Sequence, residues 1–106
     1  MLYELTITPT EGIELIELAV EKETAKQFKV KRGSKLFRSV INKYETEHVC
    51  ESHFANEYHV WFTDLADLPR FKEEIIERLN QDLEKLLTRA STLETHIENL
   101  KRLEVQ

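Results

Sequence analysis

The sequence predicts an α+β fold, with a small antiparallel β-sheet head over residues 1–68 and one long amphipathic helix over residues 69–106. Two patterns lead to this prediction: apolar and polar residues alternate in short stretches of the head, and an apolar heptad repeat runs through the last third of the chain. The chain has 106 residues, the length of one domain. It contains only two glycines and two prolines, so its elements should be long and regular.

Four segments of the head have the composition and spacing of strands; they are residues 2–8, 13–20, 27–31 and 58–62. In the first segment, Tyr3, Leu5 and Ile7 share one face, which is typical of a half-buried strand. A turn over residues 9–12 and a polar hairpin connection over residues 21–24 should join the first three strands. These segments predict an antiparallel sheet.

The segment 34–57 between the third and the last strand is ambiguous. Its apolar residues have helical spacing; they are Leu36, Phe37, Val40, Ile41 and Tyr44. The same residue types are also good strand formers. We expect a short helix here, with strand or irregular structure as the alternative.

The last third predicts a long helix that begins near Asp67 and Pro69, because proline is tolerated in the first helical turn and an acidic residue favours a helix N-terminus. Its heptad positions are Ile76, Leu83, Ala90 and Ile97 at a, and Leu79, Leu86, Leu93 and Leu100 at d. A seam of this length needs a partner helix. We therefore expect a dimeric coiled coil, in which a second copy of the chain covers the seam.

The orientation of the two helices stays open. Arg89 at a g position and Glu94 at the following e position would attract each other in a parallel dimer. One exposed ion pair contributes only about 0–1 kcal/mol. An antiparallel dimer or a higher oligomer is the alternative.

Positive charge is concentrated in residues 26–43, which hold seven basic residues and no acidic one in a chain whose net charge is −5. A basic segment of this density can attract an anion. We expect the ligand-binding residues to be Lys29, Lys31, Arg32, Lys35 and Arg38, with the arginines as the better anchors for bidentate contacts. The alternative is that the lysines line the solvent face of a strand and pair with glutamates of its neighbour.

Three of the four histidines and the only cysteine lie close together, at His48, Cys50, His53 and His59. Imidazole and thiolate groups are zinc ligands. Their spacing here is not that of a known metal motif, so we expect ordinary surface or edge residues and no metal. Because the chain also lacks a glycine-rich phosphate loop or a catalytic motif, we expect neither a cofactor nor enzymatic activity.

The order of the segments suggests a class of protein. A basic stretch written KQFKVKRGSKLFRSVINK is followed by a strand written YHVWFTD and by LPRFKEEIIERLNQDLEKLL, which leads the tail. In this layout the chain resembles small uncharacterised proteins of phages and mobile elements that have a β-hairpin head and a C-terminal coiled-coil helix. The resemblance implies accessory proteins that act by binding, often against host systems, and it transfers no functional residue.

Three functions are compatible with these patterns. The first is a non-catalytic homodimeric binding protein that captures a host protein or a small anionic ligand such as a nucleotide, as a counter-defence inhibitor. The second is a nucleic-acid-binding dimer that uses residues 26–43, and the third is a structural coiled-coil adaptor. The net negative charge counts against the second.

The sequence also predicts a location. A single cysteine is usual in a reducing compartment, and no apolar run reaches the ~18 residues that a membrane span needs. We therefore expect a cytoplasmic protein without a membrane partner, located in the host cytoplasm if it is encoded by a phage.

Overall fold

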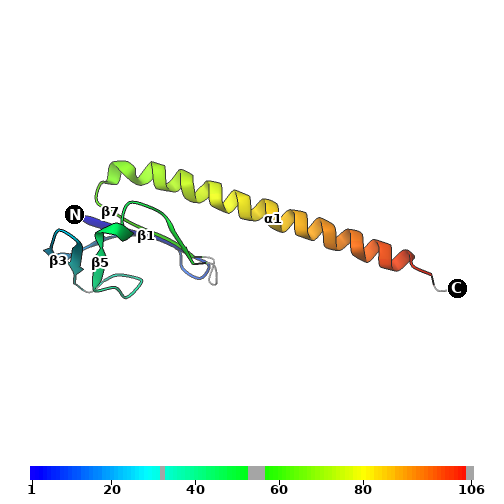
Figure 1. Ribbon diagram of the computed structural model, residues 1–106, viewed down its shortest axis with the longest axis horizontal. Coiled ribbons are helices and arrows are strands. Elements are labelled where there is room, and N and C mark those ends of the chain that lie inside the picture. The colour runs from blue at the N-terminus through cyan, green and yellow to red at the C-terminus, as the bar shows by residue number, and fades with distance from the viewer. Residues whose placement is uncertain (32, 53–56, 105–106) are drawn as a thin grey trace. The chain divides into compact units, whose positions relative to one another are not determined.

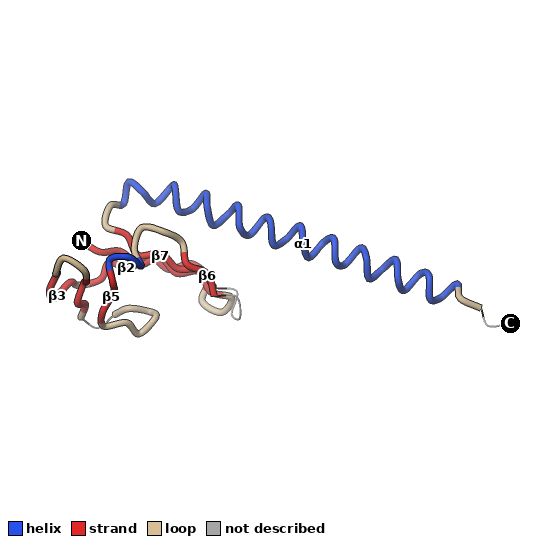
Figure 2. The backbone as a smooth tube through the Cα atoms, viewed as in Figure 1, coloured by secondary structure: helices blue, strands red, loops and turns tan. Residues whose placement is uncertain are grey.

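The computed structural model describes residues 1–31, 33–52 and 57–104, and within them it confirms the α+β class. Figure 1 follows the chain from the strands of the head to the single long helix, and Figure 2 distinguishes the two kinds of element by colour. The elements are, in order, β1 (Leu2–Thr8), β2 (Gly12–Leu18), β3 (Val20–Glu23), β4 (Gln27–Val30), β5 (Val40–Asn42), the 3₁₀ turn η1 (Lys43–Glu45), β6 (Cys50–Ser52), β7 (Glu57–Phe62), the 3₁₀ turn η2 (Leu65–Asp67) and α1 (Leu68–Arg102).

The strands form two antiparallel sheets. The larger one has the order β2-β1-β7-β6, and the smaller one has the order β3-β4-β5. In the larger sheet, Glu4 of β1 lies opposite Ile16 of β2 and Trp61 of β7. The first and last strands of the head are therefore neighbours, although they are far apart in the sequence.

Apolar side chains cover both faces of the larger sheet. One group consists of Leu5, Val49, Tyr58, Val60, Phe62, Phe71 and Ile75, and the other consists of Leu2, Leu18, Phe28, Val30, Ile41 and Trp61. β1 and β7 contribute to both groups, because successive residues of a strand point to opposite faces. The expectation of a half-buried first strand was wrong, since β4 and β5 add Phe28, Val30 and Ile41 to the second face.

The remaining strand predictions were largely correct. The segments 2–8, 27–31 and 58–62 form β1, β4 and β7 within one residue. The segment 13–20 is divided at Ala19 into β2 and β3, and the expected hairpin connection at 21–24 is mostly strand. A register shift between Val20 and Lys22 accompanies this change of sheet, as bulges commonly do.

The short helix expected within residues 34–57 was wrong. This segment contains an irregular loop, β5, η1 and β6. Phe28 and Lys29 of β4 lie opposite Ile41 and Val40 of β5, and Ile41 is fully buried. Pairing with β4 and burial of Ile41 therefore outweighed the helical spacing, since β-branched residues fit both patterns.

The helix begins one residue before Pro69, as the sequence indicated. Asp64 caps the preceding η2 turn by accepting a hydrogen bond from the backbone N–H of Ala66. Phe71 and Ile75, in the first turns of the helix, are buried in the same group as Phe62, and the rings of Phe62 and Phe71 lie 5.2 Å apart. No helix in the described part of the chain meets the length and hydrophobicity of a membrane span.

The chain divides into two compact units, Met1–Ile75 and Ile76–Gln106. The first unit contains both sheets and the beginning of α1. The second unit contains the remainder of α1, and residues 79–104 are all exposed in the single chain. Each unit is therefore considered separately below.

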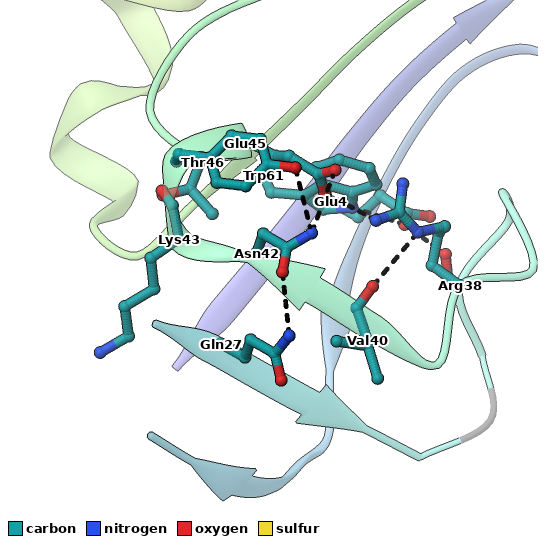
Figure 3. Close-up of polar contacts among 11 residues, drawn as sticks. Glu4, Gln27, Arg38, Val40, Asn42, Lys43, Glu45, Thr46 and Trp61 are labelled. Atoms are coloured by element: carbon teal, nitrogen blue, oxygen red, sulfur yellow. Dashed lines mark hydrogen bonds and ion pairs between the residues drawn. The ribbon is translucent and has the colours of Figure 1, made fainter. Parts of the chain in front are cut away.

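A buried carboxylate attaches the loop between β4 and β5 to the larger sheet. Glu4 is fully buried, and its two oxygens accept three hydrogen bonds: from Ser34 Oγ at 2.6 Å, from the backbone N–H of Lys35 at 2.7 Å and from Trp61 Nε1 at 2.9 Å. Figure 3 shows Glu4 beside the Trp61 ring. Because a buried carboxylate needs hydrogen-bond partners, Glu4 holds the middle of this loop, at Ser34 and Lys35, against the larger sheet.

We expect Glu4→Gln to lower the free energy of unfolding by about 1–3 kcal/mol for each donor left without an acceptor, because an amide nitrogen cannot accept these hydrogen bonds. Urea denaturation measures the loss, and amide hydrogen exchange should show faster exchange at Lys35. Glu17→Gln, on an exposed position of β2, serves as the control and should change neither. Equal losses in the two variants would contradict the anchoring role of Glu4.

Candidate functional site

The loop that Glu4 anchors borders a hollow of about 820 Å³ in the first unit. Its lining includes Lys31, Lys35 and Arg38, together with Val30, Phe37 and Glu11. We call this feature the basic hollow. Its volume lies within the roughly 300–1,000 Å³ that is usual for pockets that bind small molecules.

The structure brings three of the five expected ligand residues together. Lys31, Lys35 and Arg38 all line the basic hollow. Lys29 lies elsewhere, in a smaller depression of about 160 Å³ that it shares with Lys22, its neighbour across β3 and β4. Arg32 lies outside the described residues.

Arg38 is held in one orientation by its surroundings (Figure 3). Its Nε donates to the carbonyl oxygen of Val40 at 3.2 Å, and its Nη2 donates to Glu45 Oε2 at 2.7 Å. Its guanidinium also lies 5.2 Å from the centre of the Trp61 ring, at cation–π distance. Two of its five N–H donors are used in these hydrogen bonds, so the group is fixed and still able to donate to an anion.

Glu45, the acidic partner of Arg38, is itself part of a polar network between β4 and η1 (Figure 3). The amide of Asn42 reaches Glu45 Oε1 at 3.5 Å, and Asn42 Oδ1 accepts a hydrogen bond from Gln27 Nε2 at 3.1 Å. The position of the Arg38 guanidinium therefore depends on the pairing of β4 with β5.

Acidic residues offset much of the positive charge of residues 26–43. Lys35 Nζ lies 3.2 Å from Glu14 Oε2, and Lys43 Nζ lies 3.3 Å from Glu23 Oε2. These contacts are partly exposed, so each contributes little to stability. They nevertheless lower the net field below what the basic segment alone suggests, whereas Lys31 forms no ion pair with the described residues.

Sequence reasoning missed two residues of this site. Glu4 occupied a position that the alternation assigned to the solvent face of a strand, and nothing local indicated its burial. Phe37 was included in the expected helical stripe, but its side chain is 97% exposed and its φ is +56°. No sequence signal predicted the burial of Glu4 or the exposure of Phe37, because both depend on where the loop after β4 lies against the sheet.

His48 lies in the turn before β6, Cys50 lies on β6 and His59 lies on β7. Cys50 lies opposite His59 in the pairing of β6 with β7, and His48 Nδ1 lies 3.0 Å from the carbonyl oxygen of Thr46. Among the described residues, no three metal-binding side chains are placed to hold one ion. His53 lies outside the described residues.

Partial burial on β7 lowers the pKa of His59 below its usual value of 6.5. Desolvation is the main cause; Glu4 opposes it by its negative charge, and Arg38 adds to it by its positive charge. The imidazole ring also packs against Trp61 in a tilted arrangement, with 4.7 Å between the ring centres and 56° between the ring planes. His59 is therefore a neutral neighbour of the Glu4–Trp61 contact at pH 7.

The heptad seam of the second unit is exposed in the single chain. Its large apolar residues, which are Ile76, Leu79, Leu83, Leu86, Leu93, Ile97 and Leu100, have between 44% and 68% of their surface exposed. Ala90 is exposed as well. A continuous apolar stripe of this kind is unusual on a lone helix in water.

We expect the free energy of unfolding to fall as the pH decreases from 7.5 to 5.5, because the unfolded chain binds a proton at His59 more readily than the folded chain does. The loss begins near pH 6.5 and is complete below the lowered pKa of the folded state. His59→Gln should make this pH dependence shallower in denaturant titrations. His96→Gln, on the exposed part of α1, should leave it as in the unmodified chain, and an unchanged profile in His59→Gln would contradict the assignment.

Comparison of the chain with protein-family models, with curated proteins and with solved structures found no match.

Proposed function

We propose that the chain is a non-catalytic binding protein that captures a small anionic ligand in the basic hollow and associates through the seam of α1. The observation that carries the first part is the convergence of Lys31, Lys35 and Arg38 on one concave surface. All three residues lie in the loop between β4 and β5, and Lys31 directly follows β4. Together they can offer an anion several charge-assisted hydrogen bonds.

Preorganisation supports this proposal. The loop is attached to the sheet by Glu4, and the Arg38 guanidinium is held by Val40, Glu45 and Trp61. A ligand therefore has fewer side chains to immobilise when it binds, which reduces the entropic cost of association. Positioned donors of this kind favour a specific ligand over diffuse attraction.

The charge distribution favours a small ligand over a nucleic acid. Glu11 lines the hollow, and Glu14 and Glu45 pair with two of its cations. A phosphate backbone needs an extended run of uncompensated cations, because it is held mainly by charge neutralisation. A hollow with a few fixed donors suits a compact anion better. Capture of a host protein, and a counter-defence role, stay predictions from the sequence.

We expect pyrophosphate, used as a minimal anionic probe, to bind the protein at low salt and to bind Lys31→Gln/Lys35→Gln at least about tenfold more weakly. Loss of one charge-assisted hydrogen bond of about 1.5–3 kcal/mol is sufficient for this change. Isothermal titration calorimetry measures both affinities.

Lys22→Gln/Lys29→Gln is the matched control, because it removes the same charge from residues that lie outside the basic hollow. Its affinity for pyrophosphate should stay within about twofold of the unmodified protein. Equal losses in both double variants would indicate general electrostatic attraction and not a site. Binding of duplex DNA with a steep salt dependence, and no binding of pyrophosphate, would favour the nucleic-acid alternative.

Self-association through α1 is supported by the exposed stripe of the second unit. Residues at a and d occur without interruption from Ile76 to Leu100, and all of them are exposed in the single chain. Burial of such side chains contributes roughly 1.5–3 kcal/mol for each one fully covered. A second copy presents the same seam and can cover it in full.

We expect Leu86→Asp/Leu93→Asp to abolish association, because each substitution would place a charge in a desolvated seam at a cost of several kcal/mol. Light scattering should then report a monomer or an unfolded chain. Gln81→Asp/Thr88→Asp adds the same charge at outward f positions and should leave the mass of the assembly unchanged. A native dimer in the seam variant would show that the seam has been assigned wrongly.

A further inference from the structure

Phe37 combines two unfavourable properties. Its φ of +56° lies in the left-handed region, which is rare and unfavourable for a bulky side chain. Its side chain is also 97% exposed, so burial of the ring does not offset this cost. The fold of the first unit therefore gains nothing evident from an aromatic ring at this position.

Glu47 also has a positive φ, but both its backbone and its side chain form hydrogen bonds within the fold. Its φ is +66°, and its backbone N–H donates to the carbonyl oxygen of Trp61 at 2.7 Å. Its carboxylate accepts hydrogen bonds from both the backbone N–H and the hydroxyl of Thr63. The strain at Glu47 is offset by these bonds, whereas the ring of Phe37 is left open to solvent.

The loop nevertheless holds Phe37 in a defined place beside the cations. The backbone N–H of Phe37 donates to the carbonyl oxygen of Ser34 at 3.1 Å, and Ser34 in turn donates through its hydroxyl to buried Glu4. Phe37 precedes Arg38 in the chain and lines the basic hollow with it and with Lys35. Strained residues that the surrounding structure holds in place are concentrated at ligand-binding sites.

We propose that the ligand of the basic hollow is a nucleotide, whose base stacks on the exposed ring of Phe37 while its phosphate contacts Lys31, Lys35 and Arg38. This inference rests on the proposed function, because it specifies the class of anion that the hollow takes. A bare phosphate or a sugar phosphate would contact only the cations and would give no role to the ring of Phe37. A nucleotide uses both, because every base has a planar face that can stack on an aromatic ring.

The experiment compares AMP with ribose 5-phosphate, which carries the same phosphate without a base, by isothermal titration calorimetry. In the unmodified protein, AMP should bind at least about fivefold more tightly than ribose 5-phosphate. Stacking of one base is worth a factor of roughly 5 to 150 in affinity. In Phe37→Asn, this preference should disappear while the affinity for pyrophosphate stays within about twofold. Asparagine tolerates a positive φ, so this variant should melt at or above the temperature of the unmodified protein.

Two further variants test the role of the ring. Phe37→Trp should keep the preference for AMP, and its fluorescence should be quenched by AMP and not by ribose 5-phosphate; Trp61, being 2% exposed, serves as the internal reference. Tyr44→Asn removes another exposed aromatic ring, 78% exposed and absent from the lining of the basic hollow, and should leave the preference for AMP unchanged.

The possible outcomes separate this inference from the proposed function. If pyrophosphate and ribose 5-phosphate bind as well as AMP, or if Phe37→Asn keeps the preference for AMP, the stacking role of Phe37 is overturned and the anion site stands. If none of the three probes binds, the proposed function fails and the nucleotide assignment fails with it. Partition of the protein onto anionic phosphatidylserine vesicles through Phe37, without binding of AMP, would overturn the assignment in favour of a lipid surface.

Discussion

The hydrogen bonds of buried Glu4 are the constraint on which the first unit depends. A carboxylate in the interior is tolerated only when its oxygens are satisfied, and here the partners come from two distant parts of the chain: the loop after β4 and the indole of Trp61 on β7. The hydrogen bonds that satisfy the buried carboxylate of Glu4 therefore also join the larger sheet to the loop that borders the basic hollow.

The two-sided burial of the larger sheet follows from this arrangement. A strand with polar residues on one face normally turns that face to water. In β1 the polar face carries Glu4 and Thr6, and both are buried. Glu4 contacts Ser34 and Lys35 of the loop after β4. The hydrogen bonds of Glu4 give the second face of the sheet a directional contact, which apolar packing alone does not provide. These hydrogen bonds hold the irregular loop whose residues Lys35 and Arg38 both line the basic hollow.

The positions of its cations distinguish the basic hollow more than its net charge does. Lys35 and Arg38 each lie within ion-pair distance of a glutamate, at 3.2 Å from Glu14 and 2.7 Å from Glu45. Such pairs weaken the long-range attraction that a nucleic acid would need, and they limit the positions that these two side chains can take. Exposed Phe37 adds a planar apolar surface at the same loop. The basic hollow therefore combines three cations, of which Arg38 is held by several contacts, with an aromatic surface.

The sequence by itself determined the α+β class, β1, β4 and β7, and the long helix with its start near Pro69, because these depend on local periodicity, on strand-forming residues and on helix-start signals. From charge density it also named Lys29, Lys31, Arg32, Lys35 and Arg38 as candidate ligand residues, and three of these five line the basic hollow. Only the tertiary structure decided that residues 40–42 form a strand, that Glu4 is buried and that Phe37 is exposed. Each of these depends on pairing or packing between segments far apart in the chain, and no local pattern reports which distant segment will cover a given face.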